Sequence, residues 1–211
     1  INMLAFLGWN PGTPQELFSL EELTNSFTLD RVGKSGAKFD PDKTKWFNEQ
    51  YLRNKSDEEL AQLIKPLVDE KGYSYPNDEM LASVCGLMKE RASFVSDLLN
   101  DDYLFVSPAT YDEKTLRKKW KENTPEIINE LKSILEGISE FSSQNIEAEF
   151  KAFLERNELG FGAVLPGFRL LVTGAGMGPS MFDICSLLGK KETLERINVG
   201  LERVSDLKQA L

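Results

Sequence analysis

The stretch "SDEELAQLIKPLVDEKG", residues 56–72, carries both a start signal and a stop signal for a helix. Ser56, followed three residues later by Glu59, forms a capping box, in which each side chain accepts a hydrogen bond from a free backbone amide of the first turn. Gly72 suits the end of a helix, because glycine adopts a left-handed conformation at little steric cost. The stretch therefore predicts one complete helix.

The same kind of signal occurs on both sides of this stretch. Ser19 with Glu22 predicts a helix from about Leu20 to Phe27, and Asp40 before Pro41 caps another helix. The apolar face of that second helix is expected to consist of Trp46, Phe47, Tyr51 and Leu52. Further helical segments are expected at residues 77–100, 112–142 and 146–157, and around Leu194, Ile197, Leu201 and Val204. Almost no segment alternates with period two, so the predicted fold class is all-α.

Composition limits the classes of protein that this chain can represent. The chain has 211 residues, 41% of them hydrophobic, which is enough for a packed core. Cys85 and Cys185 lie a hundred positions apart in apolar helical patterns, which favours two reduced core residues over a disulfide. No apolar run approaches the roughly 20 residues that span a bilayer. We therefore expect a protein without a membrane span.

Histidine is absent from the chain. This absence excludes Ser-His and Cys-His nucleophile pairs, zinc sites that contain histidine, and an imidazole acid or base. The acidic residues show neither the spacing of an EF-hand nor that of a paired catalytic site. We therefore expect no catalytic residue and no metal ligand in this chain.

The net charge of −9 argues against nucleic acid as a partner, because phosphate contacts require a basic surface. The charge is unevenly distributed, however. Residues 30–55 contain four acids and seven basic side chains, which we call the cationic strip: Arg31, Lys34, Lys38, Lys43, Lys45, Arg53 and Lys55. A local surface for phosphate contact is therefore compatible with an acidic protein.

Three short motifs have alternative interpretations. "GKS" at 33–35 resembles the end of a Walker A loop, but the required glycine five positions earlier is Thr28. "TGAGMGPS" at 173–180 has the spacing G-x-G-x-G, whereas dinucleotide binding needs G-x-G-x-x-G. "RKKWK" at 117–121 fits an RNA-binding stripe, although a solvated helix face with Trp120 turned inward is favoured. No motif establishes a nucleotide site.

Three stretches together resemble the C-terminal half of bacterial glutamyl-tRNA synthetases: "LAFLGWNPG" at 4–12, "FSLEELTNSFTLDRVGKSGAKFDPDKTKWFNEQYLR" at 18–53, and "TGAGMGPSMFDICSLLGKKETLERI" at 173–197. The resemblance implies consecutive helical bundles. Residues 1–53 correspond to the latter part of a stem-contact region, and residues 54–110 and 111–211 to two anticodon-binding domains. The irregular segment "DDYLFVSPATYD", residues 101–112, contains the second boundary.

The resemblance also implies a function. The chain would be the tRNA-binding part of a class I aminoacyl-tRNA synthetase, a glutamate–tRNA ligase. Its catalytic half, which uses ATP and Mg²⁺, would lie upstream of Ile1, and this chain itself would hold no cofactor. Because the chain opens inside an apolar helical pattern without an initiator methionine, we expect a preceding segment. The expected partner is glutamate tRNA, with no DNA or membrane, and the protein is expected to be a cytoplasmic monomer.

Two arginines are expected to read the anticodon. Arg91, in "MKERASF", matches the arginine that reads the third anticodon base in discriminating members of the family, and a guanidinium presents two donors to a cytosine. The residues alone favour a surface ion pair of Arg91 with Glu90 or Asp97, and only the resemblance favours the reading of a base. Arg169 is a weaker candidate of the same kind.

The remaining expected RNA contacts lie at the two ends of the chain. The resemblance places "TGAGMGPS" near the anticodon, with its glycines allowing close approach to a base. Gly178 stands where some members carry a contacting threonine, which leaves backbone groups and the apolar Pro179 and Met181 as stacking surfaces. Thr173 is expected to brace the loop. In the cationic strip, the expected contacts to the tRNA backbone are Lys34, Lys38, Lys45 and Arg53.

Two other functional classes are compatible with the sequence. A helical protein-interaction module would use an apolar groove between helices and would not need the cationic strip. A free-standing enzyme would need acid and base groups that this chain hardly has. The dependence of binding on salt separates the interaction module from the RNA-binding protein.

Overall fold

The computed structural model describes residues 1–34 and 36–210, and within them the fold is all-α, as predicted. Ser35 of the "GKS" motif lies outside the described residues. The α-helices are α1 (Asn2–Phe6), α2 (Leu20–Ser26), α3 (Pro41–Asn54), α4 (Asp57–Glu70), α5 (Asp78–Met88), α6 (Glu113–Lys119), α7 (Thr124–Gly137), α8 (Ser143–Arg156), α9 (Phe161–Thr173) and α10 (Met181–Ala210). Short 3₁₀ helices are η1 (Leu29–Arg31), η2 (Lys89–Arg91), η3 (Val95–Leu99) and η4 (Asp102–Leu104).

The predicted helix starts are confirmed by their hydrogen bonds. The Ser56 hydroxyl accepts from the Glu59 amide at 3.1 Å, and the Glu59 carboxylate accepts from the Ser56 amide at 2.9 Å. Ser19 and Glu22 form the same pair of bonds. Gly72 follows α4 with a φ of 70°. Local sequence signals therefore determine where these helices begin and where α4 ends.

The prediction of continuous helical structure from Asn77 to Asn100 is wrong. α5 ends at Met88, and the chain continues through η2 and η3. One reason is the Asp97 carboxylate, which accepts hydrogen bonds from the amides of Ser93 at 3.0 Å and Phe94 at 2.9 Å. A second is Arg53 of α3, which donates to the Glu90 carbonyl at 3.2 Å. These contacts stabilise a turn that helical periodicity does not reveal.

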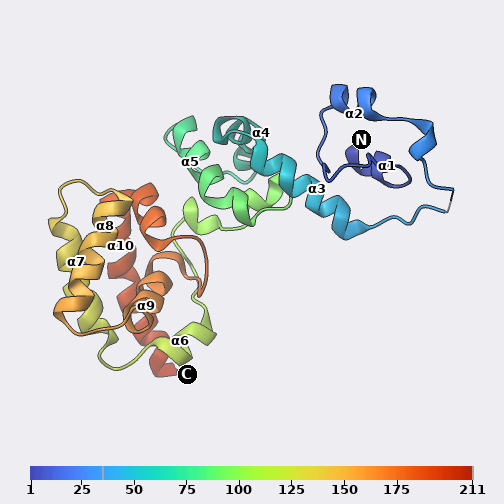
Figure 1. Ribbon diagram of the computed structural model, residues 1–211. Helices are drawn as coiled ribbons and strands as arrows, with labels where there is room; N and C mark the ends of the chain where they lie inside the picture. The colour runs from blue at the N-terminus through green and yellow to red at the C-terminus, as the bar shows by residue number, and fades with distance from the viewer. Residues whose placement is uncertain (35, 211) are drawn as a thin grey trace.

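The helices follow one another in three groups along an elongated molecule (Figure 1). The N-terminal group holds α1 and α2 around a small cluster of Trp9, Phe18 and Leu23. α3 leads from it to the group that contains α4 and α5, and α6 to α10 form the last group. The division at residues 53 and 110 stays a prediction, since the buried core is continuous from Leu52 to Val204.

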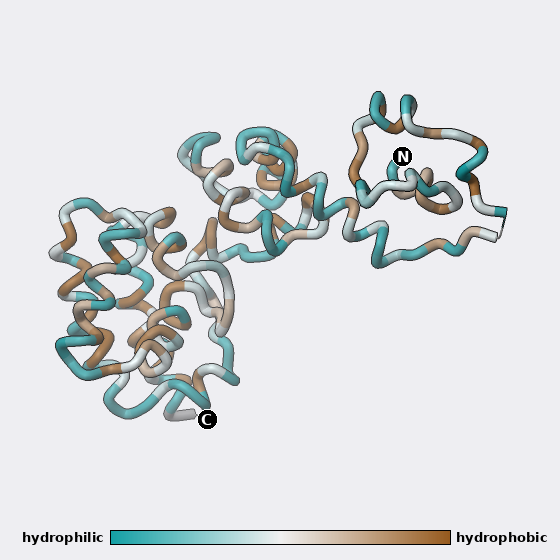
Figure 2. The backbone as a smooth tube through the Cα atoms, viewed as in Figure 1, coloured by the Kyte–Doolittle hydropathy of each residue, from teal (hydrophilic) through white to brown (hydrophobic). Residues whose placement is uncertain are grey.

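The core of the last group lies between α7, α8, α9 and α10, where brown and teal residues alternate along the helices (Figure 2). Trp120 is buried, so the "RKKWK" run does present its tryptophan inward. Cys85 and Cys185 are buried free thiols, as expected. Burial raises the pKa of both to about 12, which leaves them unreactive at neutral pH. Of the helices described, none is long and apolar enough to span a membrane.

Candidate nucleic-acid interface

The segment 174–180 joins α9 to α10, and we call it the glycine loop. An added Cβ at Gly174 would lie 2.4 Å from the Thr110 carbonyl oxygen, and one at Gly176 would lie 2.2 Å from the Thr115 hydroxyl. At Gly178 it would lie 2.7 Å from the Tyr103 hydroxyl. These glycines are therefore needed for packing against residues 103–115 of the same chain, and their role in the approach of a base stays a prediction.

Thr173 braces this loop, as expected. Its hydroxyl donates to the Arg169 carbonyl at 2.8 Å and accepts from the Ala175 amide at 3.1 Å. The side chain is buried, so it has no surface for a ligand. Thr173 therefore supports the loop instead of contacting RNA.

Arg91 reaches the glycine loop from 87 positions away. It lies in η2 with an exposed side chain, and its Nη2 donates to the Gly178 carbonyl at 2.9 Å. The alternative ion pairs are not formed: Glu90 pairs with Arg53, and the Asp97 carboxylate accepts from two backbone amides. The structure thus brings together two regions that lie far apart in the sequence.

Arg169 approaches the same loop from inside the molecule. Its side chain is 9% exposed, and its Nη2 donates to the Pro179 carbonyl at 2.6 Å. Its Nη1 is buried without a hydrogen-bond partner among the described residues. Burial lowers the pKa of the Arg169 guanidinium, and the nearby Arg91 lowers it further. Two arginines therefore hold consecutive carbonyls of one loop.

A groove of about 770 Å³ lies beside this pair, between α5 and the start of α10. Apolar lining comes from Met80, Leu87 and Leu187. Arg91 is the one basic residue among the described lining residues, while Glu79 and Asp183 are acidic. Because the carboxylates repel phosphate, the groove suits the neutral edge of a base better than a nucleic-acid backbone.

Neither of the two expected stacking residues is exposed. Met181 is only 2% exposed, because its side chain packs into the main core, and Pro179 is buried too, although it borders the groove. The exposed apolar side chain of the loop is Met177, at 84%. Met177 was not among the predicted contacts, and its only signal in the sequence is its position between Gly176 and Gly178.

The cationic strip is smaller than its composition suggests. Arg53 is half-buried and its Nε lies 3.3 Å from the Glu90 carboxylate, so it is not a free phosphate contact. Lys43 pairs with Glu16. Lys34, Lys38 and Lys45 are exposed and form no ion pair with any residue that the structure describes. Arg31 is likewise exposed and forms no ion pair with a described residue, so the available part of the strip consists of these three lysines and Arg31.

Metal binding has no support among the residues described, since they contain no group of three or more potential His, Cys, Asp or Glu ligands. The candidate interface comprises three exposed lysines, two arginines, the groove and the glycine loop. Its chemistry is that of hydrogen bonding, apolar contact and cationic attraction.

Comparison with known proteins gives consistent matches. Residues 59–201 match the family described as "Anticodon binding domain". The chain is 51% identical over 198 residues to a glutamate–tRNA ligase of Flavobacterium psychrophilum, and 48% identical over 203 residues to that of Phocaeicola vulgatus. These matches cover 93% and 96% of this chain, but only 39% and 40% of the relatives.

Solved structures agree with the sequence matches. A glutamate tRNA ligase from Elizabethkingia meningosepticum, in complex with its amino acid, superposes with a TM-score of 0.91 at 36% identity. The superposition covers 96% of this chain and 40% of that one. The glutamate–tRNA synthetase of Elizabethkingia anophelis gives a TM-score of 0.88 at 35% identity, over 95% of this chain and 39% of the other. The chain thus spans about 40% of the length of the relatives that it matches.

Proposed function

The chain belongs to the anticodon-binding-domain family, and from this premise we propose that it is the tRNA-binding part of a glutamate–tRNA ligase. The relatives with that name support the proposal through their identity over nearly all of this chain. The single observation that carries it is the convergence of Arg91 and Arg169 on consecutive carbonyls of the glycine loop, beside the groove. Sequence-specific RNA recognition uses unstacked bases in loops, and such bases need donors beside an apolar surface.

Arg91 is the proposed reader of the third anticodon base. Its guanidinium is exposed, uses Nη2 for the Gly178 carbonyl, and lines the groove. The remaining donors are in reach of a base edge, and hydrogen bonds from a charged donor are stronger than those between neutral groups. Arg169 is buried, so its proposed contribution is to hold the loop beside the base.

Lys34, Lys38 and Lys45 are the proposed contacts to tRNA phosphates. Such contacts fix the position of the RNA but carry no sequence information. Affinity and its salt dependence therefore come from the free lysines, whereas selectivity for the anticodon base comes from the groove. The same proposal assigns the ATP and Mg²⁺ chemistry to a part of the enzyme outside this chain, with the chain itself non-catalytic, monomeric and cytoplasmic.

The test is equilibrium binding of the purified chain to glutamate tRNA and to the same tRNA with an altered third anticodon base. Tighter binding of the unaltered tRNA, weakening as salt increases, is the expected result. Binding that ignores both salt and the altered base would contradict the proposal. Pyrophosphate exchange with glutamate and ATP should stay at background.

A protein-interaction module is the second candidate, and one observation favours it. A mostly apolar groove of about 400 Å³ lies beside α3, and the side chains of Phe39 and Phe94 in its lining are 53% and 51% exposed. A protein partner in that groove would bind with little dependence on salt, because burial of apolar surface is not screened by ions. The salt titration above therefore separates the two candidates.

A further inference from the structure

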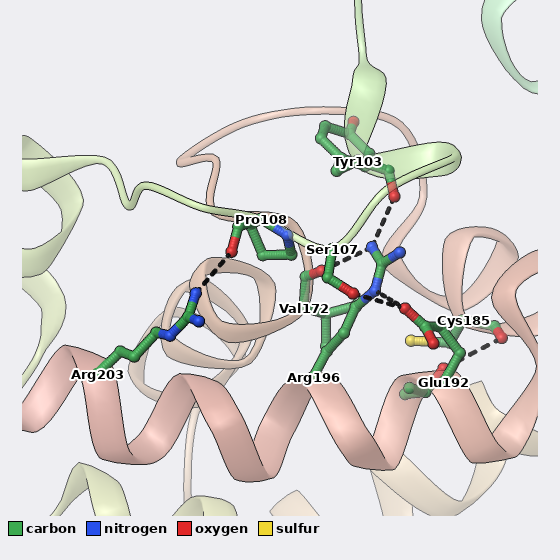
Figure 3. A network of polar contacts seen from close by, with 9 residues as sticks. Tyr103, Ser107, Pro108, Val172, Cys185, Glu192, Arg196 and Arg203 are labelled. Atoms are coloured by element: carbon green, nitrogen blue, oxygen red, sulfur yellow. Dashed lines mark hydrogen bonds and ion pairs between the residues drawn. The ribbon is translucent and has the colours of Figure 1, made fainter. Parts of the chain in front are cut away.

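Arg196 of α10 is the centre of a buried polar network (Figure 3). Its side chain is 4% exposed, its Nη1 donates to the Tyr103 carbonyl at 2.6 Å and to the Val172 carbonyl at 3.2 Å, and its Nε donates to Glu192 at 2.7 Å. The Ser107 hydroxyl donates to the same Glu192 oxygen at 2.8 Å. Burial raises the pKa of Glu192, but the bonds from Arg196 and Ser107 outweigh it and keep the pKa below its usual value.

This network joins three separate elements of the fold. Tyr103 and Ser107 belong to the connector, residues 101–112; Val172 lies in the last turn of α9; Glu192 and Arg196 lie on α10. The glycine loop runs between α9 and α10 and rests on the connector. Arg196 therefore ties the connector and the end of α9, which both support the glycine loop, to the part of α10 that follows the non-helical residue Gly189.

The connection from Arg196 to the loop passes through Tyr103. The Tyr103 side chain is 7% exposed, and its hydroxyl donates to Asp101 at 2.7 Å. That hydroxyl would lie 2.7 Å from a Cβ on Gly178, so the backbone of the loop packs directly against it. At the other end of the loop, the Asp112 amide donates to the Gly174 carbonyl at 2.8 Å. A shift of the connector must therefore move the loop.

The loop in turn holds Arg91 through the Gly178 carbonyl. We infer that Arg196 is a positioning residue for RNA recognition: by fixing the connector, α9 and α10, it sets the place of the Gly178 carbonyl and hence of the Arg91 guanidinium. The effect of Arg196 on RNA selectivity rests on the proposed function. Its effect on the position of the loop can be tested in the protein without RNA. Arg196 itself is buried and touches no RNA.

The first test uses the free chain. Lysine has one ammonium group in place of a planar fork, so Arg196→Lys loses the simultaneous bonds to Tyr103 and Glu192. The control is Arg203→Lys, on the same helix, where an exposed guanidinium donates to the Pro108 carbonyl at 3.5 Å, a longer contact than any that Arg196 makes. Hydrogen exchange should become faster in the glycine loop and the connector of Arg196→Lys while α7 and α8 keep their protection. A uniform change, or none, would overturn the inference.

The second test measures RNA selectivity, as the ratio of affinities for the two tRNAs that differ at the third anticodon base. Arg196→Lys should reduce this ratio by about two- to thirtyfold, the range for residues that act through an intervening network. In an Arg91→Gln background it should have no further effect, because both changes act on the same contact. Additive losses would assign Arg196 a role independent of Arg91 and overturn the inference.

Ser107→Ala is a milder variant that keeps Arg196 and removes one bond to Glu192. It should shift exchange and selectivity in the same direction by a smaller amount, even if Arg196→Lys folds poorly. A wild-type chain that binds tRNA without selectivity would contradict the proposed function, while the exchange experiment would still decide whether Arg196 positions the loop. If selectivity is lost in Arg91→Gln but retained in folded Arg196→Lys, the inference about Arg196 is overturned and the proposed function is not.

Discussion

At the residue scale, Arg91 carries the proposed specificity, because it is an exposed side chain held in place by one backbone carbonyl. Arg91→Gln should reduce discrimination at the third anticodon base by about 1–3 kcal/mol, since it removes a charged donor. Thermal stability should change little, because the lost bond is exposed. The measurement is affinity for the two tRNAs, with the melting temperature recorded in parallel.

Arg117→Gln is the matched control for the loss of one positive charge. Arg117 is exposed on α6 and its Nη2 lies 3.6 Å from Glu113, an i,i+4 pair of the kind that contributes little. It should leave the discrimination unchanged. If Arg91→Gln, like Arg117→Gln, weakens binding to the two tRNAs by the same factor, Arg91 attracts RNA electrostatically and does not read the base.

Alanine substitutions at Gly178 and Gly162 should have opposite effects on stability. An alanine Cβ at position 178 would lie 2.7 Å from the Tyr103 hydroxyl and 2.8 Å from Arg169 Nη1, and both side chains are buried and held by hydrogen bonds. Gly178→Ala should destabilise the fold by about 1–3 kcal/mol. Gly162, in the first turn of α9, has no atom within 4 Å of its Cβ position, so Gly162→Ala should stabilise it by about 0.5 kcal/mol. Denaturant midpoints measure both, and equal effects would contradict this packing argument.

At the element scale, helix caps determine how the chain responds to acid. Asp112 caps α6, and hydrogen bonds from the side chain and backbone amide of Thr115 hold its pKa below the usual 3.8. A pKa that is lower in the folded state means that the contribution to stability is complete above the unfolded value and is lost as the pH falls through the folded one. Asp112 therefore stabilises the fold at neutral pH and ceases to do so in acid.

Asp112→Asn isolates this effect, because asparagine caps helices about as well as aspartate but does not titrate there. The melting temperature of the wild type should fall more steeply than that of the variant between about pH 5 and pH 2. The other carboxylates titrate in both proteins, so the difference between the two curves belongs to Asp112. Parallel curves would show that its pKa is the same in the folded and unfolded chain.

Helix starts could be predicted from the sequence because the cap and its partner lie three residues apart, as in Ser19–Glu22 and Ser56–Glu59. The end of α5 was missed for two reasons: its local signal is Asp97 behind Phe94, which lacks the serine or threonine of a capping box, and its other contact comes from Arg53, which is distant in the sequence. The same limit applies to the candidate site. Packing between distant segments produces the contact between Arg91 and Gly178 and the burial of Met181. The three free lysines could be predicted, because basic residues outnumber acids in residues 30–55.

At the scale of the whole molecule, affinity and selectivity are expected to reside in different parts of the chain. The free lysines lie in the N-terminal 45 residues, whereas Arg91 and the glycine loop belong to the middle and last groups of helices. Long-range attraction of RNA by an acidic protein must come from local positive charge, because the net charge of −9 repels phosphate. Removal of the lysines should therefore affect every tRNA alike.

The triple variant Lys34→Ala, Lys38→Ala, Lys45→Ala should weaken binding to both tRNAs by the same factor and leave their ratio unchanged. If each lysine neutralises one phosphate, the slope of log affinity against log salt should become shallower by about 3, at roughly 0.9 per contact in duplex regions. The control is Lys114→Ala, Lys118→Ala, Lys119→Ala, which removes the same charge from exposed positions at α6. The control should change the slope by less than about 0.9, the value for one phosphate contact, because those lysines lie on a solvated helix face. Equal slopes for the two triple variants would mean that RNA responds only to total charge, and the three N-terminal lysines would then not be phosphate contacts.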